Sequence, residues 1–239
     1  MTIGPPRSRL ARRRFICGCC GGALLGWVPA PAHATEEIIV PVTEEPRHHI
    51  RFENEYLRII EVIVAPQDET LFHRHTLDSV LVVTRDSRIR LQQLGSPEAG
   101  IGDTSFLNYK AHPIVHRLAN LGPEPVVGID CEIILPEPGR FPPPDRTAMP
   151  SYVPEIDNER VRAWRLRIEP GQSAPPVRQA GPGVRVVLSG GRLSETVQGA
   201  PDRTVEVAPG AYEWQPAGRV RTVTNTGASP LEMVEIEVR

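Results

Sequence analysis

Short stretches in which hydrophobic and polar residues partly alternate occur along most of the chain. Residues 57–64 and 161–168 both show this alternation, and a period of two is typical of a β-strand with one buried face. Turn-forming pairs follow each stretch, Pro66-Gln67 in one case and Pro170-Gly171 in the other. No stretch of twelve or more residues has the pattern of an amphipathic helix. Many short strands joined by turns predict an all-β fold, a sandwich or a barrel.

The second part of the chain repeats the first at a spacing of about 104 residues. Residues 54–58 match residues 158–162, and both segments begin with Asn-Glu. Further matches are residues 80–83 with 184–187 and, one residue out of step, residues 120–122 with 225–227. A nearly constant register over most of both halves indicates two homologous domains.

A proline-rich segment separates the two repeats. Seven prolines lie between Pro136 and Pro154, which is typical of an extended linker. We therefore expect a first domain at residues 35–136, a linker at residues 137–154 and a second domain at residues 155–239.

The first 34 residues resemble an export signal. They contain five arginines and no acidic residue, then an apolar run at residues 15–28 and the small-residue pattern Ala32-His33-Ala34. This order is typical of a secretory signal peptide, and Arg12-Arg13 resembles the pair of the twin-arginine motif. An ordinary secretory signal with a basic start is the alternative. We expect cleavage after Ala34, a periplasmic location and no membrane span afterwards.

Removing this segment changes the charge and the cysteine count. The remainder carries 22 basic and 29 acidic residues, and such an acidic body repels phosphate backbones, so nucleic-acid binding is not expected. Three of the four cysteines lie within residues 1–34. Only Cys131 is left, which excludes a disulfide within the mature chain, and its apolar neighbours predict a buried thiol.

Three histidines of the first repeat are the main candidates for functional residues. His73 and His75 are alternate residues of a predicted strand, so both imidazoles face the same side. His116 follows 41 residues after His75 and begins the pattern His-x-x-x-Asn that ends at Asn120. The two patterns together resemble the motifs of the cupin superfamily. The resemblance extends to residues 210–225 of the second repeat and implies two tandem cupin β-barrels, a bicupin.

The resemblance implies a metal site in the first barrel. His73, His75 and His116 match the three histidine ligands. The family's glutamate has no exact counterpart, because Ser79 or Val80 stands at its place. Asp78 is the nearest carboxylate and would ligate the metal, bond to a ligand or cap the turn. Glu69, four residues before His73, is the other candidate. The second repeat has Val177, Gln179 and Arg221 at the ligand positions, so we expect it to be metal-free.

Imidazole ligands suit Fe, Mn, Ni, Cu or Zn, and three of them leave coordination positions open. One divalent transition metal is therefore the expected cofactor. The resemblance implies a metal-dependent oxygenase similar to quercetinase-like cupins, with Asp78 or Glu69 as base, or a metal-assisted isomerase or decarboxylase. The alternative is a non-catalytic periplasmic protein that binds a metal or a small ligand. A small molecule is the expected partner, and the protein is expected to be a monomer or a homodimer.

Other polar residues of the first repeat are less informative. We expect His48 and His49 to be exposed, or to lie over the mouth of the barrel. Tyr109, Lys110 and His112 belong to a stretch longer than its counterpart, expected to be an exposed loop or to reach an anionic substrate. Serine-hydrolase and nucleotide-binding motifs do not occur in the sequence.

Overall fold

The structure, a computed structural model, describes residues 37–95, 103–135, 139, 146 and 149–239. The chain divides into two units, residues 1–36 and 37–239, and the predicted export signal lies outside the described residues. So does most of the predicted linker. Among the described residues, none belongs to a helix long and apolar enough to span a membrane.

The described chain is built from strands, apart from the single-turn helix η1 (Val42–Glu44). The first half contains β1 (Ile39–Pro41), β2 (His48–Glu53), β3 (Leu57–Val64), β4 (Phe72–His75), β5 (Ser79–Arg85), β6 (Ile89–Gln93), β7 (Thr104–Leu107), β8 (Ile114–Asn120) and β9 (Val126–Ile133). The second half contains β10 (Tyr152–Asp157), β11 (Val161–Ile168), β12 (Val177–Arg178), β13 (Gly183–Ser189), β14 (Gly191–Val197), β15 (Arg203–Val207), β16 (Tyr212–Gln215), β17 (Val220–Asn225) and β18 (Leu231–Val238). The all-β expectation is confirmed.

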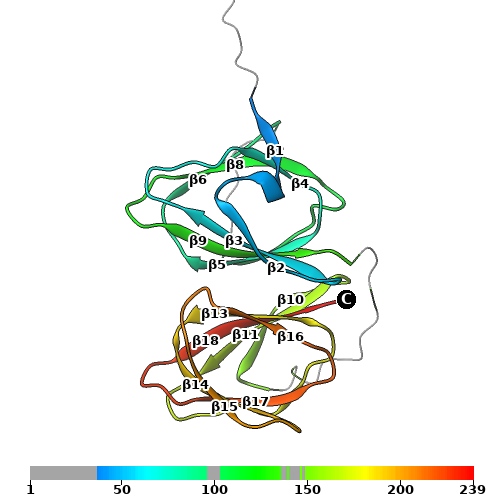
Figure 1. The fold of residues 1–239 in the computed structure, drawn as a ribbon, viewed down its shortest axis with the longest axis vertical. Coiled ribbons are helices and arrows are strands. Elements are labelled where there is room, and N and C mark those ends of the chain that lie inside the picture. Colours follow the sequence, from blue (N-terminus) through cyan, green and yellow to red (C-terminus); the bar gives the residue numbers. More distant parts are fainter. Residues whose placement is uncertain (1–36, 96–102, 136–138, 140–145, 147–148) are drawn as a thin grey trace, which may run out of the picture. The chain divides into compact units, whose positions relative to one another are not determined.

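Each half forms a barrel from one larger and one smaller sheet (Figure 1). The larger sheets have the orders β2-β3-β9-β5-β7 and β10-β11-β18-β13-β16. The smaller sheets have the orders β1-β4-β8-β6 and β12-β17-β14-β15. Equivalent strands occupy equivalent places, as the repeat predicts: β3 and β11 each pair with the last strand of their half, β9 and β18.

The repeat extends to individual hydrogen bonds. Asn120 donates through Nδ2 to the carbonyls of Val64 and Glu124, and Asn225 donates in the same way to Ile168 and Ser229. Both side chains also accept a bond from the amide of the glycine two residues later. One amide side chain therefore ties three backbone segments together at the same corner of each barrel.

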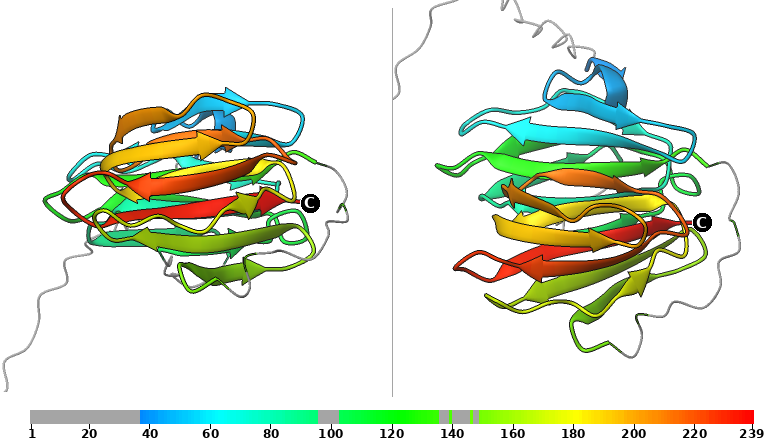
Figure 2. Two further views of the ribbon diagram at one scale, coloured as in Figure 1. Left: turned by 90° about the horizontal axis from the view of Figure 1, so that it is seen from below. Right: turned by 60° about the horizontal axis from the view of Figure 1, so that its bottom comes forward.

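The largest hydrophobic core lies between the two barrels, where the larger sheets pack face to face. Its buried members come from both halves: Leu57, Ile59, Val80, Val82, Ile129, Cys131 and Ile133 from the first, and Val161, Ala163, Val184, Val186, Val234, Ile236 and Val238 from the second. We call this contact the seam. The views in Figure 2 show the strands of the two sheets lying alongside each other, as in an aligned sandwich.

Strand alternation explains why the seam is apolar while the barrel interiors are partly polar. On β9, Ile129, Cys131 and Ile133 face the seam, so Asp130 and Glu132 point the opposite way, into the first barrel. All five residues are buried. Cys131 is a free, buried thiol, as expected.

The second domain begins earlier than the linker prediction assumes. β10 starts at Tyr152, inside the predicted linker at residues 137–154, because Tyr152 and Val153 pair with Leu166 and Arg165 of β11. Proline alone does not prevent this pairing, since Pro154 lies on the edge strand of its sheet, where a missing N–H is tolerated.

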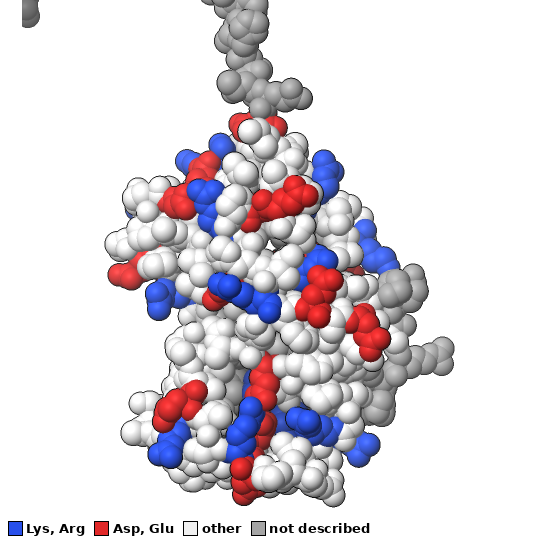
Figure 3. All heavy atoms as spheres, in the orientation of Figure 1, with Lys and Arg blue, Asp and Glu red and all other residues white. Residues whose placement is uncertain are grey.

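Acidic and basic side chains are interspersed over both barrels on the face drawn in Figure 3.

The seam predicts a strong, position-specific effect on stability. Ile59 is 0% exposed in the seam, whereas Ile50 of the neighbouring strand is 45% exposed. We expect Ile59→Ala to lower the free energy of unfolding by about 2–5 kcal/mol through lost burial and a cavity. Ile50→Ala should change it by less than about 1 kcal/mol. Urea denaturation measures both, and equal effects of the two substitutions would contradict the assignment of the seam as the main core.

Candidate metal centre

Two neighbouring strands bring the three predicted ligands together. His73 on β4 lies directly opposite His116 on β8 in the antiparallel register, and the side chains of such a pair are neighbours on one face. His75 lies two residues along β4 and therefore on the same face. Arg74 between them is exposed, while all three histidines are buried. The period-two argument from the sequence predicts this arrangement correctly.

The three imidazole rings converge edge to face. The ring centroids are 4.5 Å apart for His73 and His116, 4.9 Å for His75 and His116, and 5.1 Å for His73 and His75. Each residue offers one nitrogen, and these nitrogens lie within 4.8 Å of one another. Among the described residues, no carboxylate belongs to this group.

Several nitrogens of the cluster are buried without a hydrogen-bond partner. They are Nε2 of His73, both ring nitrogens of His75, and Nδ1 of His116. Nδ1 of His73 lies 2.9 Å from the carbonyl oxygen of Leu71. When Nδ1 donates its hydrogen to this oxygen, Nε2 keeps a lone pair that is free to bind a metal. Buried polar atoms are rarely left unpaired, and an imidazole held by a backbone carbonyl on one nitrogen is typical of a metal ligand. The residues therefore fit a divalent transition metal.

The local environment keeps these rings neutral. Burial lowers the pKa of His73 to about 4 and that of His116 to about 3, and the neighbouring imidazoles act in the same direction. Burial also lowers the pKa of His75 well below 6.5. A neutral imidazole has a lone pair for a metal, so the cluster is ready to bind one at neutral pH without first losing protons.

A fourth histidine lies beside the cluster. The ring of His48, the first residue of β2, is 4.5 Å from that of His73 and 6.3 Å from that of His75 between centroids. Its Nδ1 lies 3.3 Å from the carbonyl oxygen of Val42, and burial lowers its pKa to about 4. Full exposure, one of the two expectations for His48, is therefore wrong. Its counterpart in the repeat is Tyr152, which is buried.

Asp130 places a carboxylate beside the imidazoles. Its Oδ2 lies 3.9 Å from Nδ1 of His75, and Oδ1 accepts a hydrogen bond from Ser79 Oγ. Burial, with a smaller contribution from Glu132, raises the pKa of Asp130 well above its usual range. Sequence reasoning missed this residue. A signal exists, because an acid inside an apolar strand recurs at the equivalent position, Glu235.

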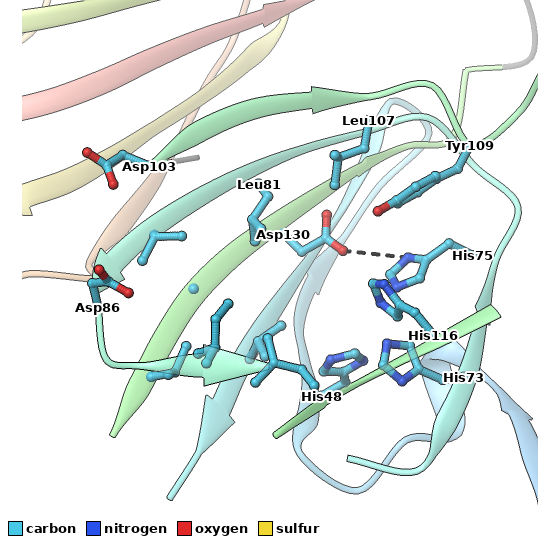
Figure 4. A pocket seen from close by; sticks show the side chains of 16 residues that line it. His48, His73, His75, Leu81, Asp86, Asp103, Leu107, Tyr109, His116 and Asp130 are labelled. Atoms are coloured by element: carbon cyan, nitrogen blue, oxygen red, sulfur yellow. Dashed lines mark ion pairs between the residues drawn. The ribbon is translucent and has the colours of Figure 1, made fainter. Parts of the chain in front are cut away.

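The histidines form one end of a cavity inside the first barrel (Figure 4). Its volume is about 80 Å³. The walls are mainly aliphatic and come from both sheets. They are Val62, Leu81, Val83, Ile89, Leu107, Leu118, Val126 and Gly128. Tyr109 also lines the cavity, with its ring centroid 4.9 Å from that of His75. Tyr109 is buried, so the expectation of an exposed loop is wrong at this residue.

Asp78 is held away from the histidines. Its Oδ2 accepts a bond of 3.1 Å from Nε of Arg160, and its Oδ1 accepts one of 2.9 Å from the amide of Lys110. Asp78 therefore links the first barrel to the start of β11 in the second. It lines a cleft shared with Arg160 and Lys110, and it is not among the residues that line the histidine cavity.

Glu69 is also occupied elsewhere. Its carboxylate lies 2.7 Å from Arg117 and 3.1 Å from Arg90, outside the cavity lining. The structure thus brings neither predicted carboxylate to the imidazoles and places Asp130 beside them instead. His112 is exposed and is likewise outside the lining.

The second barrel fills the equivalent space with ion pairs. Gln179 and Arg221 stand where His75 and His116 stand in the first barrel, and Gln179 Oε1 accepts bonds from Arg221 and from Arg146. Both arginines also pair with Glu235, at 2.6 and 3.0 Å. Burial opposes ionisation of Glu235, but Arg221, Arg146 and Arg185 together outweigh it and lower its pKa to about 2. These ion pairs occupy the places that correspond to the histidines of the first barrel.

Comparisons with solved structures identify the fold. AerE from Microcystis aeruginosa superposes with a TM-score of 0.55 at 15% identity, covering 82% of this chain and 98% of its own. Salicylate 1,2-dioxygenase from Pseudoaminobacter salicylatoxidans, solved as adducts with gentisate, gives 0.54 at 12% identity, covering 77% of this chain and 68% of its own. No protein-family model matches the sequence, and no curated protein matches it.

A cupin domain from Bordetella pertussis Tohama I is 27% identical over 39% of this chain and 98% of its own, with a TM-score of 0.35. The superpositions above 0.5 are at low identity and therefore show the fold alone. The fold is that of the cupins, in two tandem jelly-roll-like barrels.

The lowered histidine pKa values predict a pH-dependent stability of the metal-free protein. The folded pKa of His73 lies below its usual 6.5, so the unfolded chain takes up this proton first as the pH falls. The contribution of the neutral ring to the free energy of unfolding is fully present above about pH 6.5 and is lost as the pH falls toward 4. At pH 5 the loss is on the order of 1–2 kcal/mol per imidazole.

Urea denaturation of metal-free protein at pH 7 and pH 5 tests this. The loss between the two pH values should be smaller in His73→Gln than in the wild type and unchanged in His112→Gln, which alters an exposed ring. Identical losses in all three proteins would contradict the burial of His73 as a neutral group.

Proposed function

We propose that the first barrel of this cupin fold binds one divalent transition metal through His73, His75 and His116 and acts as an oxygenase on a small organic molecule. One observation carries the proposal. Three buried imidazoles with unpaired nitrogens converge at the end of an apolar cavity. A closed structural site would have four protein ligands, whereas three leave positions for exchangeable ligands.

The metal, when bound, supplies a Lewis acid and, in the case of Fe, Mn, Ni or Cu, redox chemistry that Zn lacks. The chain's own residues supply the surroundings. The aliphatic walls exclude bulk water, which strengthens electrostatic interactions within the cavity. Leu71 orients His73 through Nδ1, and Asp130 lies on the Nδ1 side of His75, where a carboxylate orients a ligating ring.

Asp130 replaces Asp78 and Glu69 in this proposal as the carboxylate of the site. It is the one whose oxygen lies within 4 Å of a cluster imidazole, whereas the other two are bound to arginines. The hydroxyl end of Tyr109 points toward Asp130 in Figure 4. These two groups are positioned to contact a molecule bound next to His75.

A non-catalytic role in binding a metal or a small ligand is the second candidate. The ligand group holds no carboxylate among the described residues, and a site of three neutral imidazoles also serves reversible binding. Oxygen consumption by metal-loaded protein in the presence of small phenols separates the two, because a binding protein consumes none above the metal-free control.

Elemental analysis tests the metal site. Protein matured through its own export route should carry about one equivalent of Fe, Mn, Ni, Cu or Zn. The double variant His73→Ala/His75→Ala should lose it, because two of three ligands are gone. His49→Ala/His112→Ala is the matched control, since His49 and His112 lie outside the cavity lining, and it should retain the metal. An absence of metal from folded wild-type protein would contradict the proposal.

We further propose that the protein is an exported bicupin, cleaved after Ala34 and located in the periplasm, on the strength of the signal-like residues 1–34. Arg12→Lys/Arg13→Lys should block export through the twin-arginine route and leave the precursor in the cytoplasm. Cell fractionation with immunoblotting measures this. Arg7→Lys/Arg9→Lys is the control and should be exported. Unchanged export of both variants would favour an ordinary secretory signal.

A further inference from the structure

Among the described residues, those that line the cavity of the histidine cluster include acidic side chains but no lysine or arginine. Asp86, Asp103 and Asp130 line it together with aliphatic, tyrosine and histidine side chains, and the described lining contains neither lysine nor arginine. Apart from a metal at the histidines, the described lining therefore provides no lysine or arginine to pair with a negatively charged substrate.

Two of the acids lie at the end opposite to the metal ligands. Figure 4 shows Asp86 and Asp103 far from His73, His75 and His116 along the cavity. Asp86 follows β5 and Asp103 precedes β7, and both are exposed. Asp86 accepts a bond from the amide of Ser87, and among the described residues neither aspartate has an ion pair with a basic side chain. No basic side chain among the described residues therefore offsets these two carboxylates.

The arginines of the neighbouring strands point away from the cavity. Arg74, between two ligands on β4, lines a separate groove with Arg58. Arg117, next to His116 on β8, bonds to Gln92 and pairs with Glu69. Strand alternation fixes this, since a residue adjacent to an inward-facing histidine must face outward.

This charge pattern disfavours an anionic substrate. A carboxylate held in the part of the cavity away from the metal loses its hydration and needs a paired cation or several hydrogen-bond donors. The acids at the outer end also repel it before it enters.

Resting on the proposed function, we infer that the first barrel takes a small, mainly apolar substrate that is neutral or carries a protonated amine, and selects against molecules with a carboxylate at the end remote from the metal. The apolar part of the substrate contacts the aliphatic walls, and an oxygen atom faces the histidines. An ammonium group, where present, lies toward Asp86 and Asp103.

Three phenols of matched shape test the inference on the full mature chain loaded with cobalt(II). They are tyramine, which is a cation, neutral 4-propylphenol, and the anion 3-(4-hydroxyphenyl)propionate. Calorimetry gives the affinities, and visible cobalt absorption reports whether each probe reaches the metal. We expect tyramine and 4-propylphenol to bind at least about ten-fold more tightly than the propionate at low salt.

Charge-neutralising substitutions separate the acids from the shape of the cavity. In Asp86→Asn/Asp103→Asn, tyramine should bind about five-fold more weakly and the propionate more tightly, with 4-propylphenol unchanged. Added salt should reduce these differences, because exposed charges are screened. Asp202→Asn/Glu206→Gln removes two exposed acids of the second barrel and should change none of the three affinities.

Three outcomes would overturn the inference while leaving the metal site intact. They are propionate binding as tight as that of 4-propylphenol, affinities unaffected by Asp86→Asn/Asp103→Asn, and a cobalt-loaded protein that binds none of the probes. A wild-type chain that takes up no cobalt instead contradicts the proposed function itself, and the inference fails with it.

Discussion

The apolar packing between the two larger sheets is the interaction on which the rest of the structure depends. Among the described residues, the interior cluster of the first barrel has four buried members, Val64, Leu91, Leu118 and Val126. The seam, by contrast, has buried apolar residues from six different strands. A domain of this size buries too little apolar surface to be very stable alone. The seam supplies that burial from outside the barrel, so the inner face of the first barrel is free to carry histidines, acids and a cavity.

The equivalent interiors of the two barrels are occupied by different kinds of side chain. In the first, unpaired imidazole nitrogens surround an open space. In the second, Arg146 and Arg221 occupy that space and pair with Glu235 and Gln179. A buried charge is tolerated only when it is paired, and here each guanidinium has a carboxylate or an amide oxygen. The contrast supports a binding role for the first barrel. The second barrel shows that ion pairs can fill such an interior when no ligand is bound there, and the first barrel keeps unpaired imidazoles and a cavity instead.

Much of the fold and half of the site were predictable from the sequence. The repeat, the strands and the placement of His73, His75 and His116 follow from local alternation and from two motifs, and they are confirmed. The partners of Asp78 were not predictable, because Arg160 lies 82 residues away and meets Asp78 only when the barrels pack. The position of Asp130 depends on which face of β9 turns inward, and the seam decides this. For His48 and Tyr109 the sequence left an exposed position and a position near the site both open, since neither belongs to a motif and only tertiary packing brings them to the cavity.

X-ray absorption spectroscopy of the zinc-loaded mature protein tests the central claim most directly, because it counts the ligands of the bound ion. The account predicts about three imidazole nitrogens near 2.0–2.1 Å, with the remaining position filled by oxygen. The imidazole contribution should fall by about one ring in His116→Gln. A spectrum with sulfur ligands, or with oxygen ligands and no imidazole, would contradict a metal centre built from His73, His75 and His116.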